Sequence, residues 1–231
     1  MAKRKKPKTP HVAADLTTPE GRRRARRELI WGDHGFLRLR FSNLHRVSDE
    51  MWRSNQPSPE QIERHVRDRG VRTIVNLRGA SSKGYYLLEK EACDALGVNL
   101  VDFQVFSRDT PTRELVFAAD RLFAELEYPA LMHCKSGADR AGLMSVLYKI
   151  LRERRSVEEA AAQLSPKYLH VRWGKTGVLD AVFDTYLRFA AETPKPFLDW
   201  VAEEYDRLAV KQAFLKTWGA RARFDALLRR E

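Results

Sequence analysis

One short segment of the chain has residue types and a spacing that suit phosphate chemistry. Cys134 is followed by five residues and then by Arg140, and residues 133–142 read HCKSGADRAG. A cysteine thiolate is a strong nucleophile, and the planar guanidinium of an arginine donates two parallel hydrogen bonds to phosphate oxygens. The spacing alone is weak evidence, because arginine makes up 29 of the 231 residues and such a pair arises readily by chance.

The elements on either side of this segment strengthen the pattern. Residues 129–133 (PALMH) are typical of a short buried strand, and apolar residues recur at helical spacing over 140–153. The loop between them must turn tightly, which Gly137 permits, and its backbone N–H groups enter a helix N-terminus, where they favour an anion. The same positive field favours the thiolate form of Cys134.

The rest of the chain alternates between predicted strands and predicted helices. This order indicates an α/β fold with a central, mostly parallel sheet of four to five strands flanked by helices, followed by a helical C-terminal extension. Two helix starts have the form of a capping box, at Ser58 and at Ser156. The predicted strands are 36–41, 71–77, 98–103 and 129–133, and the predicted helices are 22–30, 58–69, 83–96, 112–127, 140–153, one that begins at 156, 178–192 and 196–230.

Composition narrows the classes of protein. No run of 18 apolar residues is present, and the basic N-terminus has no apolar segment after it, so we expect neither a membrane-spanning helix nor a secretory signal. Two cysteines do not make a disulfide framework, which predicts a reducing, cytoplasmic location. We expect Cys93 to be a packed core thiol of helix 83–96, with a reversible disulfide to Cys134 as the alternative.

The ten-residue segment resembles the signature His-Cys-x5-Arg of the cysteine-dependent protein tyrosine phosphatase superfamily. The chain is most similar to the compact dual-specificity-like members, of the bacterial and atypical eukaryotic branch, and the similarity covers about 44–192. Besides the signature, it rests on four segments, which are Trp52–Ser58, Thr73–Arg78, Gln163–Ser165 and Trp173–Gly177.

The resemblance implies a mechanism and a role for each residue of the loop. Cys134 attacks phosphorus and forms a cysteinyl-phosphate, while Arg140 and the backbone amides of 135–140 bind the phosphate oxygens. His133 supports the loop, and Ser136 orients the thiolate through its hydroxyl. The superfamily often has a hydroxyl residue directly after the arginine, where this chain has Ala141. The predicted phosphate-binding residues are Lys135, Ser136, Gly137, Ala138, Asp139 and Arg140.

The superfamily takes the proton for the leaving group from an aspartate on a separate loop. Asp109 is our first choice for this general acid, because it follows a strand and precedes the helix that leads back to Cys134. Asp102 and Asp139 are the alternatives. The chemistry needs no metal or cofactor, and none is predicted.

We expect three parts of the chain: a basic, flexible N-terminal arm over 1–30, a phosphatase domain over 31–193 and a helical extension over 194–231 packed on that domain. The net charge is +11, and the arm carries +7 of it, with ten Lys or Arg and three Asp or Glu. Such an arm attracts an acidic partner or an anionic membrane surface. No zinc-finger spacing, aromatic RNA-binding signature or basic heptad region is present, so no specific nucleic acid is predicted.

The predicted substrate is a phosphorylated protein or a small phosphate ester, and a tyrosine or dual-specificity protein phosphatase is our first interpretation. Lys135 and the basic arm favour the alternative of a phosphoinositide or inositol (pyro)phosphate phosphatase. Asp139 counts against it, because a carboxylate in the loop repels additional phosphates. Two further alternatives are a catalytically weak phosphate-binding adaptor and a nucleic-acid or membrane-surface protein that depends on residues 1–30.

Overall fold

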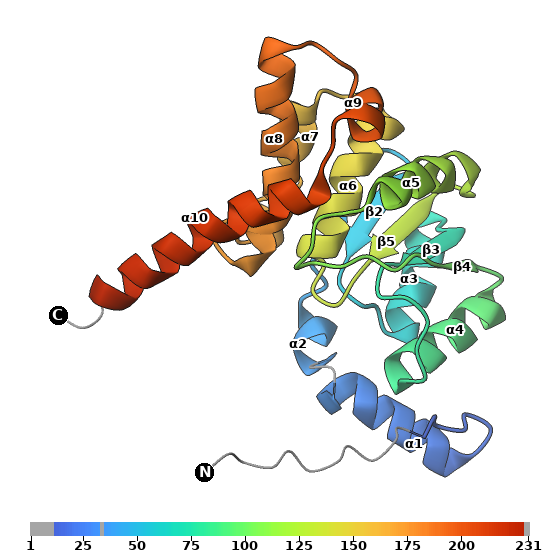
Figure 1. Ribbon diagram of the computed structural model, residues 1–231. Coiled ribbons are helices and arrows are strands. Elements are labelled where there is room, and N and C mark those ends of the chain that lie inside the picture. The colour runs from blue at the N-terminus through green and yellow to red at the C-terminus, as the bar shows by residue number, and fades with distance from the viewer. Residues whose placement is uncertain (1–11, 33–34, 229–231) are drawn as a thin grey trace.

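A five-stranded, mostly parallel sheet forms the centre of the molecule (Figure 1). The computed structural model describes residues 12–32 and 35–228. The strand order is β1-β2-β5-β3-β4, and only β1 runs antiparallel to its neighbour. The predicted α/β fold class is therefore confirmed. The strands are β1 (His45–Arg46), β2 (Met51–Ser54), β3 (Thr73–Asn76), β4 (Asn99–Asp102) and β5 (Ala130–His133).

The register of the parallel strands aligns their carboxyl ends in one row. His133 at the end of β5 is paired with Ser54 at the end of β2 and with Asn76 at the end of β3, which is paired in turn with Asp102 at the end of β4. Cys134 is the next residue after this row. The carboxyl edge of the sheet therefore carries the end of four strands, with the cysteine loop above its centre.

Side chains of successive strand residues point to opposite faces of the sheet, and both faces are covered by helices. Ile74 and Leu131 pack with Ile62 and Cys93 on the face that α3 and α4 cover. Val75 and Met132 belong to the larger core on the other face. The covering helices are α3 (Pro59–Arg69) and α4 (Gly84–Leu96) on the first face, and α5 (Arg113–Glu125) and α6 (Asp139–Leu151) on the second.

The helix boundaries that the sequence predicted from capping residues hold in the structure. Ser58 and Gln61 make both hydrogen bonds of a capping box at the start of α3, and Gly70 ends this helix in the left-handed region at φ +62°. The Ser156 hydroxyl caps α7 (Val157–Ala161) through the Glu159 N–H.

The C-terminal part is helical, as predicted, but it forms separate helices. Helix α8 (Val178–Glu192) has the predicted bounds, whereas the predicted helix 196–230 is divided into α9 (Phe197–Glu203) and α10 (Arg207–Leu228). Aromatic residues of α8 and α9 pack on one another and join the larger core on the face of the sheet that α5 and α6 cover. Helix α10 packs on α8 along its first turns and then extends away from the body (Figure 1).

One prediction about the N-terminal part is wrong. Residues 36–41 were expected to form a strand, but α2 (Gly35–Arg40) is a helix. The buried residues Gly35 and Arg38 are three positions apart, which is the spacing of one helix face, whereas a strand would bury alternate residues. The pattern also did not reveal the hairpin β1–β2, because each of its strands is very short.

The N-terminal arm predicted over 1–30 contains the helix that was expected over 22–30, and this helix packs on the domain. Helix α1 (Pro19–Arg27) continues into a π-helical turn (Glu28–Gly32), and Ala25 and Leu29 bury themselves against Leu88 of α4. Polar contacts add to this packing: Arg22 pairs with Glu91 of α4, and the Gly84 N–H donates to the Glu28 carboxylate. Residues 1–11 lie outside the described residues. None of the described helices has the length and apolar character that a bilayer crossing requires.

Candidate active site

The loop between β5 and α6 wraps closely around the sulfur of Cys134. The Gly137 N–H donates a hydrogen bond to the Cys134 Sγ at 3.3 Å, and Cys134 is buried. Gly137 has φ +75°, and a Cβ at this position would lie 2.8 Å from the backbone of Ser54 and Asn55. Both the conformation and the close approach therefore require glycine here.

The carbonyl groups of residues 135–138 turn away from the sulfur and receive donors from the segment 43–56. A peptide whose carbonyl points outward turns its N–H to the opposite side, which is the side of the sulfur. The loop thus has the arrangement of an anion cradle. The four contacts are Gln56 N to Lys135 O at 3.4 Å, Asn43 Nδ2 to Ser136 O at 2.9 Å, and Arg53 Nη2 to Gly137 O and Ala138 O at 2.8 and 2.9 Å.

Arg140 is the second residue of α6 and is half-buried. Its Nη1 donates to the carbonyl oxygen of Leu77 at 3.5 Å, and Leu77 directly follows β3. The guanidinium therefore lies over the carboxyl edge of the sheet, on the same edge as Cys134.

A buried polar chain supports the loop from below. His133 Nε2 lies 2.5 Å from the Glu89 Oε1, and both side chains are fully buried. The other Glu89 oxygen accepts a hydrogen bond from Gln56 Nε2 at 2.8 Å, and Gln56 Oε1 accepts one from Arg78 Nη1 at 2.9 Å. This series of contacts joins β5 to α4 through His133, the residue that directly precedes the nucleophile.

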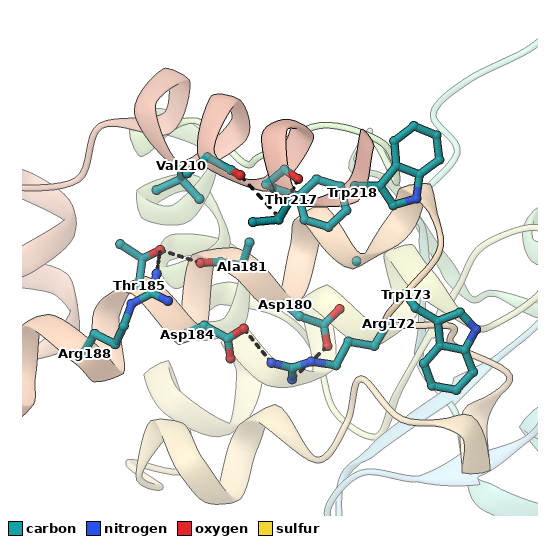
Figure 2. Close-up of a pocket in the computed structure, with 13 residues that line it drawn as sticks. Arg172, Trp173, Asp180, Ala181, Asp184, Thr185, Arg188, Val210, Thr217 and Trp218 are labelled. Carbon is teal, nitrogen blue, oxygen red and sulfur yellow. Dashed lines mark hydrogen bonds and ion pairs between the residues drawn. The ribbon is translucent and has the colours of Figure 1, made fainter. Parts of the chain in front are cut away.

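On the α8 side, His170 joins the loop to the helices behind it. His170 Nδ1 is 2.8 Å from the Asp139 Oδ1, and its Nε2 is 2.7 Å from the Asp180 Oδ2. Asp180 also pairs with Arg172, which in turn pairs with Asp184. Figure 2 shows Arg172 reaching both carboxylates at the floor of a pocket between α8 and α10, whose lining includes neither Cys134 nor Arg140.

The two carboxylates determine the charge of His170. Burial alone would lower its pKa, but the hydrogen bonds and charges of Asp139 and Asp180 outweigh burial and raise the pKa of His170 to about 9. His170 is therefore an imidazolium at neutral pH. It offsets the negative charge that Asp139 brings to the phosphate-binding loop.

Asp109, the predicted general acid, forms ion pairs with α10. Its carboxylate pairs with Arg207 at 2.9 Å and with Lys211 at 3.0 Å, both on α10, and it accepts a hydrogen bond from the Thr110 N–H. Burial alone would raise the pKa of Asp109, but the hydrogen bonds and charges of Lys211 and Arg207 hold it below its ordinary value. A proton donor at this position must first separate from the two cations.

Asp102 lies in the row of strand ends beside the cysteine loop. Its Oδ1 accepts a hydrogen bond from Asn76 Nδ2 at 2.7 Å, and its Oδ2 accepts one from the Tyr86 hydroxyl at 2.5 Å. Asn76 is the register partner of both Asp102 and His133. The register thus sets Asp102 two strands away from β5, or roughly 10 Å.

The sequence also assigned a role to Ser136 and to Cys93. The Ser136 hydroxyl accepts a hydrogen bond from the Ala138 N–H at 3.4 Å, whereas the donor to the Cys134 sulfur is the Gly137 N–H. Cys93 is a buried core thiol, as expected, and burial raises its pKa to about 12. In the described part of the chain, no three His, Cys, Asp or Glu side chains are grouped to hold a metal ion.

Five residues of the site were missed as functional residues by sequence reasoning. Arg53 and Gln56 lie in the segment Trp52–Ser58, which contributes to the family resemblance. The sequence therefore marked their segment but did not indicate what the two residues do. Asn43, Glu89 and His170 have no spacing that points to the loop. Only the tertiary contacts bring them there.

The fold and the site together define a cysteine-dependent phosphatase of the dual-specificity-like type, which hydrolyses a phosphate ester. Residues 41–172 match the model of the family described as "DSP-PTPase phosphatase fused to NAD+ Kinase". This match spans more than half of the chain, and the chain belongs to that family.

Solved structures with low sequence identity share the fold. The crystal structure of TpbA from P. aeruginosa has a TM-score of 0.51 and 21% identity, over 73% of this chain and 91% of that one. The crystal structure of Tk-PTP in its active form has a TM-score of 0.50 and 17% identity, over 63% of this chain and 98% of that one. No protein with a curated function matches the chain.

Proposed function

We propose that this phosphatase acts on phosphorylated proteins, as a tyrosine or dual-specificity phosphatase, and that Cys134 is its nucleophile. The observation that carries the assignment is the closed loop around the sulfur. The Gly137 N–H donates to Cys134 Sγ, and the outward-facing carbonyls of 135–138 leave the N–H groups on the sulfur side.

The reaction proceeds in two displacements at phosphorus. The Cys134 thiolate attacks in line, so that an S–P bond forms while the bond to the leaving oxygen breaks, and that oxygen takes a proton. Water then attacks the cysteinyl-phosphate, releases inorganic phosphate and regenerates the thiolate. The backbone N–H groups of residues 135–140 hold the three equatorial oxygens together with the guanidinium of Arg140.

Asp109 donates the proton to the leaving oxygen, under the condition that its ion pairs with α10 open. Arg207 and Lys211 keep the carboxylate ionised in the present arrangement, which suits a base and opposes an acid. Asp102 is the competing donor, because the strand register sets it at the same edge of the sheet as the cysteine loop, two strands away from β5. Asp139 is the weakest alternative, since the His170 imidazolium holds its carboxylate.

Exposed apolar side chains on two sides of the loop favour an aryl phosphate. Phe106 is 62% exposed and follows Val105, whose N–H shares the Leu77 carbonyl with Arg140. Leu169 is 52% exposed and precedes His170, the partner of Asp139. Such side chains suit the ring of a phosphotyrosine.

A reducing compartment suits this chemistry, because a thiolate nucleophile is lost on oxidation. A cytoplasmic location is therefore part of the proposal. Contact of the basic N-terminal segment with an acidic partner or an anionic membrane surface remains a prediction from its charge.

A phosphate-release screen tests the proposed function. We expect the full-length protein to release phosphate from phosphotyrosine peptides faster than from phosphoinositides or inositol phosphates, and the Cys134→Ser variant to release none. Retained turnover in Cys134→Ser would refute the nucleophile. A preference for phosphoinositides or inositol phosphates would move the substrate class to the alternative that Lys135 and the basic arm favour.

A further inference from the structure

We propose that Arg53 is a positioning residue for catalysis, which holds the phosphate-binding loop in its active form by binding its outward-facing carbonyls. This inference rests on the proposed function, because it explains how the loop described above keeps its N–H groups toward the substrate. Arg53 lies on β2 and does not belong to the ten-residue signature.

The side chain of Arg53 is fully buried and its guanidinium binds two segments at once. Nη2 donates to the carbonyls of Gly137 and Ala138, at 2.8 and 2.9 Å. Nη1 donates to the backbone carbonyl of Gln163 at 2.7 Å and to its side-chain Oε1 at 3.1 Å. The Tyr168 ring covers the guanidinium, with 4.2 Å from Cζ to the ring centroid.

A loop that points its N–H groups at an anion must turn its carbonyls into the protein. Buried carbonyls require donors, and a carbonyl that loses its donor favours a rotated peptide. Arg53 donates to the carbonyls of Gly137 and Ala138, which directly precede α6. The Ala138 carbonyl also accepts the first helical hydrogen bond of α6, from the Gly142 N–H at 2.9 Å, so the Gly137 carbonyl is the one that the loss of Arg53 affects most. A planar guanidinium can serve both segments at once, whereas an ammonium group has no such fixed geometry.

The charge of Arg53 adds to this effect. Burial lowers its pKa to about 10, against the opposing charges of Cys134, Tyr168 and Asp139, so it remains a cation at neutral pH. Its charge interacts with that of Cys134, and it is a cation of the site in addition to Arg140 and the His170 imidazolium. Arg53 thus favours the thiolate and the bound anion while its own hydrogen bonds go to backbone carbonyls.

The test compares Arg53→Lys and Arg53→Met with Arg46→Met as a matched control. Arg46 lies on the neighbouring strand β1, is exposed and pairs with Asp49. Three quantities are measured per folded molecule: kcat on an aryl phosphate, inhibition by inorganic phosphate, and the rate at which iodoacetamide alkylates Cys134. Near-UV circular dichroism gives the folded fraction.

We expect kcat to fall about 100-fold in Arg53→Met and about 10-fold in Arg53→Lys, from the loss of charged hydrogen bonds. The inhibition constant of phosphate should rise by similar factors and alkylation should slow, while Arg46→Met matches the wild type in all three. A merely structural role would lower the melting temperature and leave the three quantities unchanged per folded molecule, and that result would overturn the inference.

Two further outcomes keep the inference separate from the proposed function. If neither Arg53 variant folds, Gln163→Leu takes their place, since it removes one acceptor that orients the guanidinium; unchanged kcat and phosphate inhibition in that variant refute the role of Arg53. Turnover that persists in Cys134→Ser refutes the proposed function itself. An inactive Cys134→Ser with normal Arg53 variants refutes the inference alone.

Discussion

Arg140 and Gly137 contribute to the loop in different ways, one through its side chain and the other through the lack of one. Arg140 brings a charge and a planar fork over the edge of the sheet. Gly137 lets the chain pass so close to Ser54 and Asn55 that no Cβ fits between them. Each can be tested by a single substitution.

Arg140→Lys should lower kcat/KM by about 10²- to 10³-fold, because an ammonium group cannot make the bidentate contact to two phosphate oxygens. Steady-state kinetics on an aryl phosphate measures this loss. An unchanged kcat/KM would show that the guanidinium does not bind the transferred phosphoryl group.

Gly137→Ala should abolish most activity and destabilise the fold by about 1–3 kcal/mol, because the new Cβ would meet backbone atoms at 2.8 Å in a conformation at φ +75°. The matched control is Gly97→Ala, at φ +65° with no atom within 4 Å of the new Cβ. It should lose about 1 kcal/mol of stability and keep its activity. Equal activity in the two variants would contradict the close approach at the loop.

Asp109→Asn and Asp102→Asn should separate the two candidate acids by their dependence on the leaving group. Loss of the true acid slows hydrolysis of a phosphoserine peptide far more than that of p-nitrophenyl phosphate, whose leaving group needs no proton. We expect this difference, about 10²-fold, in Asp109→Asn. If Asp102→Asn shows it instead, Asp109 has only the structural role that its ion pairs indicate.

Between elements, the buried His170 links the first turn of α6 to α8. Its pKa of about 9 in the folded protein lies above the ordinary value of 6.5. The folded state therefore binds the proton more tightly than the unfolded chain, and this contribution is fully present below pH 6.5 and is lost as the pH rises through 9.

The free energy of unfolding should accordingly fall by about 2–3 kcal/mol between pH 7 and pH 10, and His170→Gln should remove most of this dependence. Glutamine retains donor and acceptor groups but does not titrate. Urea unfolding at several pH values measures both proteins. Identical slopes in the variant and the wild type would show that His170 is not an imidazolium between Asp139 and Asp180.

At the scale of the whole molecule, the C-terminal helices hold the loop that carries Asp109. The Tyr205 hydroxyl donates to the Pro111 carbonyl at 2.9 Å, Arg113 donates to the Tyr205 carbonyl, and Thr110 Oγ1 donates to the Arg207 carbonyl. Together with the two ion pairs of Asp109, these contacts connect α9 and α10 to the loop before α5. The C-terminal part thus controls the position of the predicted acid.

Removing both cations, in the double variant Arg207→Met and Lys211→Met, should move the basic limb of the pH–rate profile to higher pH. Without the two positive charges the pKa of Asp109 rises toward its ordinary value, and the donor stays protonated over a wider range. The profile of kcat/KM on a phosphoserine peptide measures the shift. A basic limb that stays in place would exclude Asp109 as the group that titrates there.

The sequence by itself determined the fold class, the order and most bounds of the elements after residue 58, and the loop from His133 to Arg140. These features follow from local physics, because apolar periodicity, capping residues and glycine positions act over a few neighbouring residues. The helix α2 was missed for the same reason, since alternation over six residues does not show which side the rest of the chain covers.

Only the tertiary structure decided which distant residues complete the site. The loop carbonyls accept hydrogen bonds from Asn43, Arg53 and the Gln56 N–H. Glu89 contacts His133, and His170 contacts Asp139. These partners lie from 31 to about 90 residues away in sequence. The tertiary structure also paired Asp109 with α10, a contact that no local pattern predicts. Hydrogen bonds and ion pairs of this kind depend on where the packed core places the backbone, and so they appear only once the chain has folded.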